Sequence, residues 1–463
     1  MAFWKIRRPP EWGTEPVPAD LRILRSYDLF ILWSSLGVGL LVLAAGTLLV
    51  SQFGLTLWEA FVVSLVGSVT GSVMLAAAAH HGSRAGVPTM VSLRPILGRR
   101  GSYVPSFLNV VQLVLWTVFE LLVMGTAVAV LSNNALGPWT AEISVPFWAL
   151  VVAALALGGP LAVVRDWLER FGIWLVWAST AAIAVALLLH GLDAGSRLPS
   201  VAPQFTGTPS FLLGLDLVVA MPVSWWPVIS DYNRFARAAR DSWLGTVLGN
   251  TIANTLFYVL GAALMFLGLL LNPPQTDFLA VIGLLGLSVL PLLIILVDET
   301  DNAFADVYSA AVSTQNLVPR WRQVWPVVAF TSVAAGGALV LLGLGQGIGG
   351  SYEAFLYLLG ALFVPLLGTV IADAFLVRRG GYRTEEFFDA APRWRWTAFA
   401  SWLPGVALYL LIYLELQYGW FPWVPPIGAT LPSFALALGL HVGFSKIDAA
   451  RSARAAAGTD TAP

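Results

Sequence analysis

Acidic, amide and hydroxyl side chains crowd one stretch of an otherwise apolar part of the chain. The stretch contains Asp298, Glu299, Thr300, Asp301, Asn302 and Asp306. On a helix, Asp298, Asn302 and Asp306 would repeat every fourth residue and share a face with Asp301 beside them. Oxygen ligands of this kind suit hard cations, so this face could line a cation path. If the stretch does not cross a membrane, the same residues form only a solvated loop.

A second polar pair lies in a run without Arg or Lys. Trp116 and Glu120 are four residues apart, which places an aromatic ring and a carboxylate on one face of a helix. Such a pair can bind a flat polar molecule, because the ring can stack on its face and the carboxylate can accept hydrogen bonds from its edge. The alternative is a structural glutamate that is hydrogen-bonded to a neighbouring helix.

Two further segments carry residues that interrupt helices. Residues 33–39 include Gly37 and Gly39 among Leu and Val, where local unwinding would release backbone carbonyls. Close packing of helices through small residues is the alternative reading. Pro222 and Pro227 lie five residues apart and remove amide donors, so we expect a helix break there instead of a simple kink.

The composition says what kind of elements must position these residues. Of the 463 residues, 58% are apolar and 11% are charged, and the mean hydropathy is +0.78. A soluble domain does not bury so large an apolar fraction. About twelve stretches are long enough to cross a bilayer. They begin near Tyr27, Leu57, Val104, Val145, Trp167, Phe211, Trp243, Ser288, Val324, Tyr352, Trp396 and Ile427.

The eighth stretch has two possible registers. A span over residues 278–297 would expel the acidic run into the cytoplasm. A span from Ser288 to Leu317, preceded by an external surface or re-entrant helix over residues 273–287, keeps Asp301 near mid-membrane. We favour the second register because the nearest basic anchors, Arg320 and Arg322, come well after the acids.

The basic residues give the orientation. All of the 25 Lys and Arg residues except Arg197 lie in the tails or in every second gap between the apolar stretches. By the positive-inside rule, this predicts a multi-pass inner-membrane protein with both termini in the cytoplasm. The net charge of −1 leaves no basic face for nucleic acid. The absence of Cys excludes disulfides and Cys-ligated metals.

The spacing of the polar segments predicts an internal repeat. The broken spans one and six are five spans apart, as are the polar spans three and eight, and two inverted five-span halves are a recurring transporter design. We therefore expect an all-α integral membrane fold. Its predicted parts are a cytoplasmic tail (1–26), a first repeat of spans one to five (27–192), a second repeat of spans six to ten (209–379), spans eleven and twelve (394–446) and a cytoplasmic tail (447–463).

Several strings, in order and spacing, resemble the first family of nucleobase:cation symporters, close to its cytosine permease and hydroxymethylpyrimidine transporter branch. They are Trp12–Pro18, Leu93–Pro95, Gly98–Ser102, Asp231–Phe235, Asp298–Asn302, Tyr308–Ala310, Phe363–Leu366, Ala372–Asp373 and Val377–Gly380. The resemblance implies a LeuT-like fold of ten core helices plus two. It also implies import of a planar base together with a cation, without a cofactor and without catalysis.

The resemblance also implies a set of site residues. The substrate would contact Trp116, Glu120, Ser224, Trp225, Asp306 and Gly39, with Trp116 stacking on the base and Glu120 binding its edge. A sodium ion would be held by Ser35, Val38, Val297, Thr300 and Asp301. The helix breaks would lie at Gly37, Gly39, Pro222 and Pro227.

Two departures from the family pattern bear on the substrate. Glu120 stands where some members have Gln, and Asp306 stands where many have Asn. Ionised carboxylates only accept hydrogen bonds, so these residues favour a donor-rich edge such as that of an aminopyrimidine. Burial could protonate one of the pair, which leaves proton coupling open, although we favour sodium.

Other functions fit parts of the pattern. A proton-coupled transporter of purines, allantoin or hydantoin-like heterocycles is the main alternative. A polytopic membrane enzyme could use Asp298, Asp301 and Asp306 on a metal, but the chain offers neither a His-rich motif nor a nucleophile and base pair. A channel fits less well, because two broken helices at one midplane pocket suit alternating access. The expected partners are a small heterocyclic base and the lipid bilayer, and the sequence predicts no oligomeric state.

Overall fold

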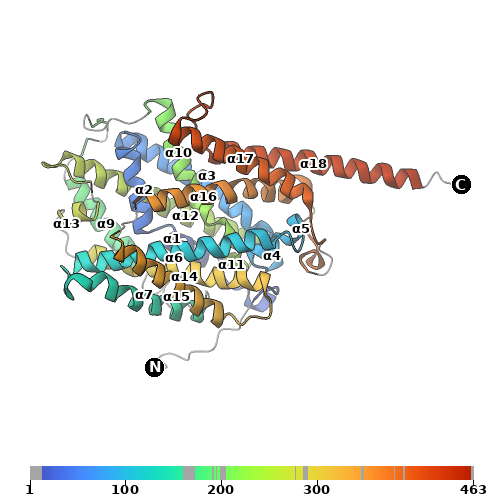
Figure 1. Ribbon diagram of the computed structural model, residues 1–463, viewed down its shortest axis with the longest axis horizontal. Helices are drawn as coiled ribbons and strands as arrows, with labels where there is room; N and C mark the ends of the chain where they lie inside the picture. The colour runs from blue at the N-terminus through green and yellow to red at the C-terminus, as the bar shows by residue number, and fades with distance from the viewer. Residues whose placement is uncertain are drawn as a thin grey trace.

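The chain folds into long helices that run side by side (Figure 1). The computed structural model describes residues 13–159, 173–189, 192–193, 195–198, 205–276, 278–284, 290–345, 349–379, 381–388 and 392–459. The predicted start of the fifth span near Trp167, the side chains of Val297 and Asp298, and parts of both predicted tails lie outside this description.

Fifteen helices of five residues or more make up the described fold. They are α1 (Ser26–Ser35), α2 (Leu40–Ser51), α3 (Leu57–Ala85), α6 (Tyr103–Leu131), α7 (Thr140–Gly158), α9 (Ile173–Leu189), α10 (Thr208–Ser224), α11 (Ile229–Asn233), α12 (Ala239–Leu270), α13 (Phe278–Leu284), α14 (Leu290–Leu317), α15 (Val324–Gly343), α16 (Gly349–Ile371), α17 (Trp396–Tyr418) and α18 (Thr430–Thr459). The single-turn helices α4 (Thr89–Ser92) and α5 (Arg94–Leu97) connect α3 to α6. The remaining short elements are the 3₁₀ turns Ala19–Leu21, Gly137–Trp139, Trp226–Val228 and Thr384–Phe387 and the π-helical segment Ala372–Val377.

The described helices confirm an all-helical membrane fold. Eight segments are long and apolar enough to cross a bilayer, or nine if the bent pair α1 and α2 forms one span. The apolar helix Val176–Leu189 is shorter. The count of about twelve spans therefore stays a prediction, whereas the all-α membrane fold class is confirmed.

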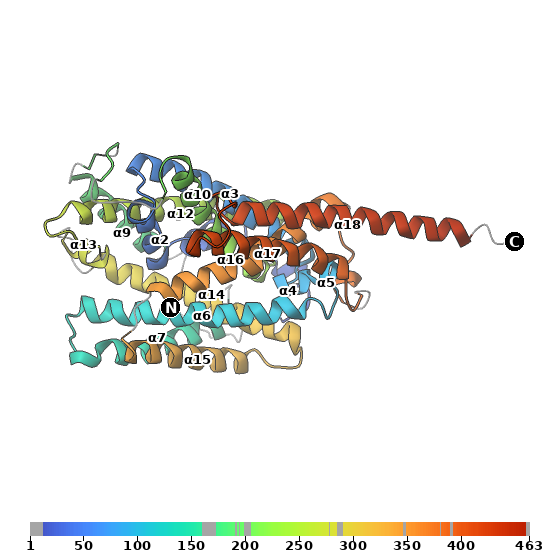
Figure 2. The same cartoon turned by 45° about the horizontal axis from the view of Figure 1, so that its top comes forward.

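The helices pack in two groups with a third set beside them. In the first group, α1, α2 and α3 pack against α12, and α10 packs against α3. In the second group, α6, α7, α14 and α15 pack on one another. The helices α16, α17 and α18 pack together, and α18 projects beyond the rest of the described fold (Figure 2). In span order, the first group holds spans one, two, six and seven, and the second holds spans three, four, eight and nine.

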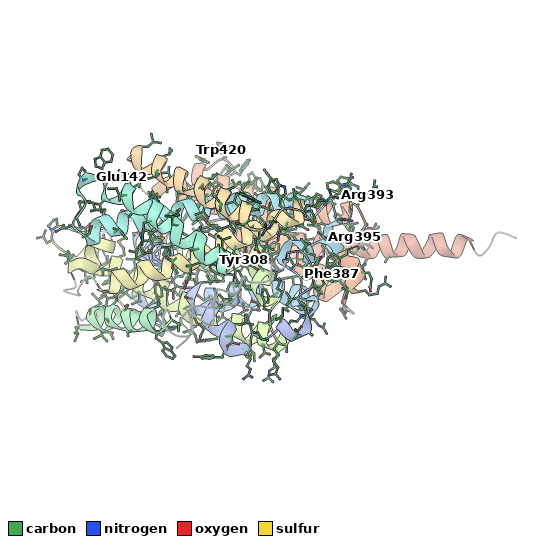
Figure 3. All side chains as sticks on the ribbon, turned by 90° about the horizontal axis from the view of Figure 1, so that it is seen from below. Glu142, Tyr308, Phe387, Arg393, Arg395 and Trp420 are labelled. Carbon is green, nitrogen blue, oxygen red and sulfur yellow. The ribbon has the colours of Figure 1, made fainter. Side chains whose placement is uncertain are left out.

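The two ends of the helical body carry different residues. Figure 3 shows Arg393 and Arg395 near the end from which α18 projects, and Glu142 near the opposite end. The arginines follow the predicted tenth span and Glu142 follows the third, so predicted cytoplasmic and external loops lie at opposite ends.

The first span is interrupted at its glycines. The helix α1 ends at Ser35 and α2 begins at Leu40, and the two axes differ by 64°. A Cβ on Gly37 would lie 3.0 Å from the Trp33 carbonyl oxygen, and one on Gly39 would lie 3.0 Å from Oε2 of Glu299. The missing side chains thus allow the unwound segment to lie directly against its neighbours.

The sixth span is interrupted later than expected. Pro222 lies inside α10, which continues to Ser224, so the prediction of a break at Pro222 is wrong. A proline removes only its own amide donor, and the helix can continue past one missing bond. The interruption is the 3₁₀ turn Trp226–Val228, which contains Pro227. There the Trp225 N–H donates to the Pro222 carbonyl at 3.2 Å, and the Val228 N–H donates to that of Trp225 at 3.1 Å.

The eighth span follows the register that we favoured. The helix α14 runs without a break from Leu290 to Leu317, and the separate short helix α13 precedes it. The polar residues 299–306 therefore lie inside a long helix that packs against α6 and α7, not in a solvated loop.

Candidate functional site

A small cavity lies where four helical segments meet. The break between α1 and α2, the middle of α6, the end of α10 and the polar stretch of α14 all line it. All six predicted substrate contacts line this cavity, namely Gly39, Trp116, Glu120, Ser224, Trp225 and Asp306. Its volume of about 30 Å³ is close to one water molecule's share of the liquid. The lining must therefore separate to admit a heterocyclic ring.

Carboxyl groups dominate the polar part of the lining. Glu120 and Asp306 are each 2% exposed, and their carboxyl groups lie close enough to interact. Among the described residues, Oε2 of Glu120 and Oδ2 of Asp306 have no hydrogen-bond partner. Buried polar atoms are almost always paired, so the two carboxyl groups either share a proton with each other or accept donors from a ligand. Two ionised carboxylates side by side would repel each other, and a ligand rich in hydrogen-bond donors would reduce this repulsion.

Glu299 and Asn302 also line the cavity, and sequence reasoning did not place them at the substrate site. The Leu40 N–H at the start of α2 donates to Oε2 of Glu299 at 3.2 Å. The Asn302 amide donates to the Val38 carbonyl at 3.1 Å. A carboxylate at a helix N-terminus is electrostatically favourable. These two side chains therefore hold the unwound segment against α14.

The helical phase explains why Glu299 was missed. We expected Asp298, Asn302 and Asp306 to share a face. Residues eight apart diverge by roughly 80° on an α-helix, whereas residues seven apart diverge by only about 20°. The cavity is lined by Glu299, Asn302 and Asp306, and the spacing of three and four residues in that set was the available signal.

Aromatic rings flank the cavity. The Trp116 ring meets that of Phe355 edge-on at 5.2 Å between centroids, and the Trp225 ring meets that of Trp33 at 6.4 Å. The Trp33 Nε1–H donates to Oδ1 of Asn233 at 2.8 Å, which fixes its plane. The Ser224 hydroxyl donates to the Met221 carbonyl at 2.7 Å, so it faces a ligand only as an acceptor.

Two of the predicted cation residues, Ser35 and Asp301, meet between α1 and α14. The Ser35 hydroxyl donates to Oδ2 of Asp301 at 3.0 Å, and the two residues are 0% and 1% exposed. Among the described residues, Oδ1 of Asp301 has no hydrogen-bond partner. Thr300 is 3% exposed and Val38 is 1% exposed. The backbone of Val297 lies in α14 one turn before Asp301. Carboxylate and hydroxyl oxygens of this kind are ligands that hard cations prefer.

Known permeases resemble the chain over most of its length. Residues 16–433 match the family model described as permease for cytosine/purines, uracil, thiamine, allantoin. The chain is 24% identical over 421 residues to a hydantoin permease from Microbacterium maritypicum, covering 84% of this chain and 82% of that protein. It is 23% identical over 399 residues to an allantoin permease from Bacillus subtilis, covering 77% of this chain and 78% of that protein.

Solved structures share the fold. The transporter Mhp1, closed with bromovinylhydantoin bound, superposes with a TM-score of 0.77 at 18% identity and covers 95% of both chains. Its inward-facing form gives a TM-score of 0.74 at 18% identity, with 95% of this chain and 94% of that one covered. A sodium-coupled sialic acid symporter gives 0.60 at 11% identity, with 92% of this chain and 89% of that one covered. The chain therefore belongs to the nucleobase:cation symporter family of permeases for cytosine/purines, uracil, thiamine and allantoin, and it is a cation-coupled membrane transporter of nucleobase-type substrates, not an enzyme.

Proposed function

We propose that this transporter imports a pyrimidine-type base bearing an amino group, such as cytosine or hydroxymethylpyrimidine. The single observation that carries the proposal is the cavity in which Glu120, Glu299 and Asp306 present carboxyl groups beside Trp116 and Trp225. An aminopyrimidine fits this lining because its amino group supplies donors to acceptor-only oxygens.

Selectivity depends on the polar groups of the site that a wrong base leaves without a hydrogen-bond partner. Stacking on Trp116 contributes roughly 1–3 kcal/mol and is similar for every flat ring. A base with a carbonyl in place of the amino group would instead face Glu120 and Asp306 with another acceptor. A site built to bind a particular donor rejects the analogue that lacks it far more strongly than an apolar pocket does.

We further propose that the coupling cation binds between α1 and α14, with sodium favoured over a proton. Ser35, Thr300 and Asp301 supply oxygens from side chains, and Val38 and Val297 supply backbone carbonyls. The contact between Ser35 and Asp301 supports this site because it joins the unwound segment to the polar helix. A carboxylate beside hydroxyl groups suits a hard cation with oxygen ligands.

The orientation and the repeat belong to the same proposal. We place the protein in the inner membrane with both termini in the cytoplasm. The division into residues 27–192 and 209–379 as inverted halves is supported by the packing, since spans one and two group with six and seven.

A second candidate function is proton-coupled transport of purines, allantoin or hydantoin-like heterocycles. The observation that favours it is the sequence similarity to proteins named as hydantoin, purine-uracil and allantoin permeases. The adjacent carboxyl groups of Glu120 and Asp306 could also carry the coupled proton.

Uptake into proteoliposomes tests the proposal. Purified protein is offered labelled cytosine, hydroxymethylpyrimidine, hypoxanthine and allantoin under an imposed sodium gradient or an imposed proton gradient. We expect saturable uptake of the two aminopyrimidines under the sodium gradient. Uptake of hypoxanthine or allantoin alone under the proton gradient would support the second candidate and overturn the first.

A further inference from the structure

A second and much larger cavity adjoins the acidic one. Its volume is about 610 Å³, and it lies among α2, α10, α16 and α17. Met221 and Ser224 line both cavities, so the end of α10 lies between them. Small-molecule sites typically enclose about 300–1,000 Å³, so the larger cavity has room for a whole base while the smaller one does not.

The mouth of the larger cavity lies at helix ends. Gln52 caps α2 and Gln417 lies in the last turn of α17, and both side chains are exposed. Polar residues at the ends of spanning helices lie at the edge of the bilayer, where water reaches them. The cavity therefore opens toward water near the predicted external loops, which favours a water-soluble occupant over a lipid chain.

Aromatic rings form one side of this cavity. Tyr357, Tyr409 and Tyr413 line it, and the rings of Tyr357 and Tyr413 lie 4.3 Å apart between centroids with a tilt of 34°. Tyrosine rings give a flat heterocycle a surface on which to stack. Base–aromatic stacking is tolerant of the ring's substituents, because every base has a π-face.

Amide groups supply most of the remaining polar lining. Gln52, Gln112 and Gln417 line the cavity, and an amide both donates and accepts hydrogen bonds, although Nε2 of Gln112 already donates to Oδ1 of Asn109. Asp216 also lines it, but its two oxygens accept the N–H groups of Ala429 and Thr430 at 3.1 and 2.9 Å. That carboxylate is therefore committed to the start of α18. This lining can therefore hydrogen-bond to a base edge that carries both donors and acceptors. The cavity beside it is lined by carboxyl groups instead.

We propose that the larger cavity is a second binding site, which takes neutral flat heterocycles of either edge type before they reach the acidic cavity. This inference rests on the proposed function, because it assigns the second site to the same class of solute. Amino- and oxo-pyrimidines would bind there with similar affinity, and selection for the amino group would follow at Glu120 and Asp306.

The natural absence of cysteine makes the test direct. Ala220 lines only the larger cavity and Val42 only the smaller one, so Ala220→Cys and Val42→Cys report the two sites separately. Each variant is exposed in proteoliposomes to a membrane-impermeant thiosulfonate, with or without cytosine or uracil. A base at about ten times its dissociation constant should slow modification about tenfold.

We expect cytosine and uracil to protect Ala220→Cys to a similar extent, whereas only cytosine protects Val42→Cys. Adding Glu120→Gln should weaken the protection of Val42→Cys by cytosine and leave that of Ala220→Cys unchanged. Adding Tyr413→Leu should weaken the protection of Ala220→Cys while the protein keeps its monodisperse elution and its thermal unfolding midpoint.

The opposite results would overturn the second site. They are protection of Ala220→Cys that disappears with Glu120→Gln, or no protection of Ala220→Cys by either base. Failure of the proposed function is a separate result, namely no gradient-driven uptake of either base by the cysteine-free parent. Protection of Ala220→Cys is a binding measurement and decides the second site without transport.

Discussion

The Ser35 hydroxyl donates a hydrogen bond to Oδ2 of Asp301 at 3.0 Å, although the two residues are 266 positions apart in the chain. Ser35 is the last residue of α1 before the break, and Asp301 lies inside α14. The contact crosses from one packed group of helices to the other. A cation held there would stabilise one arrangement of the two groups, and this is how ion binding and transport would be coupled.

Replacing Asp301 tests that coupling. Asp301→Asn keeps an oxygen for the Ser35 hydroxyl but removes the negative charge. We expect the sodium concentration for half-maximal uptake to rise about tenfold or more, as for the loss of about 1.4 kcal/mol of cation binding. Asp193→Asn is the matched control, because that carboxylate lies in an exposed loop. An unchanged sodium dependence in Asp301→Asn would remove this residue from the cation site.

Trp116 is expected to bind every aromatic substrate. In Trp116→Ala the stacking surface is lost, and the KM for uptake should rise about 5- to 150-fold, equivalent to roughly 1–3 kcal/mol. Trp116→Phe should retain much of the affinity. Trp423→Ala serves as the control because Trp423 is 71% exposed. Equal KM values for Trp116→Ala and the parent would exclude stacking.

The unwound segment leaves little room at Gly39. In Gly39→Ala the methyl group would lie 3.0 Å from Oε2 of Glu299 and 3.2 Å from the Asn302 amide nitrogen. The backbone at Gly39 is extended with φ 163°, so the expected loss of uptake comes from this contact and not from backbone strain. Gly336→Ala in α15 meets nothing within 4 Å and should transport normally. Similar uptake rates for the two variants would contradict the close approach.

Glu299 should stabilise the break more through its oxygen than through its charge. In Glu299→Leu the Leu40 N–H loses its partner, which costs about 1–3 kcal/mol for a buried donor. Glu299→Gln keeps an acceptor of the same length. We therefore expect the thermal unfolding midpoint to fall more in Glu299→Leu than in Glu299→Gln. The reverse order would show that the bond to Leu40 contributes little.

Much of this arrangement could be read from the sequence because it depends on local signals. Gly37 and Gly39 mark the first break, and the basic anchors after α14 place its polar stretch inside a long helix. Trp116 and Glu120 share a face through simple helical spacing. The glycines and the pair of Trp116 and Glu120 are signals within one or two helical turns, and the basic anchors Arg320 and Arg322 follow the same helix in sequence.

Other features depend on contacts that periodicity cannot supply. Pro222 is tolerated within α10, and the interruption falls at Pro227 instead. The role of Glu299 depends on the start of α2 lying against α14, a contact between residues 259 positions apart. The larger cavity is lined by helices from distant parts of the chain, and the helical spacing of its lining along each helix does not show which helices face one another.

If carboxyl groups in the small cavity select a donor-rich base, competition for uptake between bases should show it most directly. Inhibition of labelled cytosine uptake by unlabelled cytosine and uracil is measured in the parent and in Glu120→Gln. We predict that the parent prefers cytosine by about tenfold or more and that Glu120→Gln loses most of this preference, since its amide also donates to a carbonyl. A parent that does not distinguish the two bases, or a folded Glu120→Gln with the parent's preference, would contradict the account.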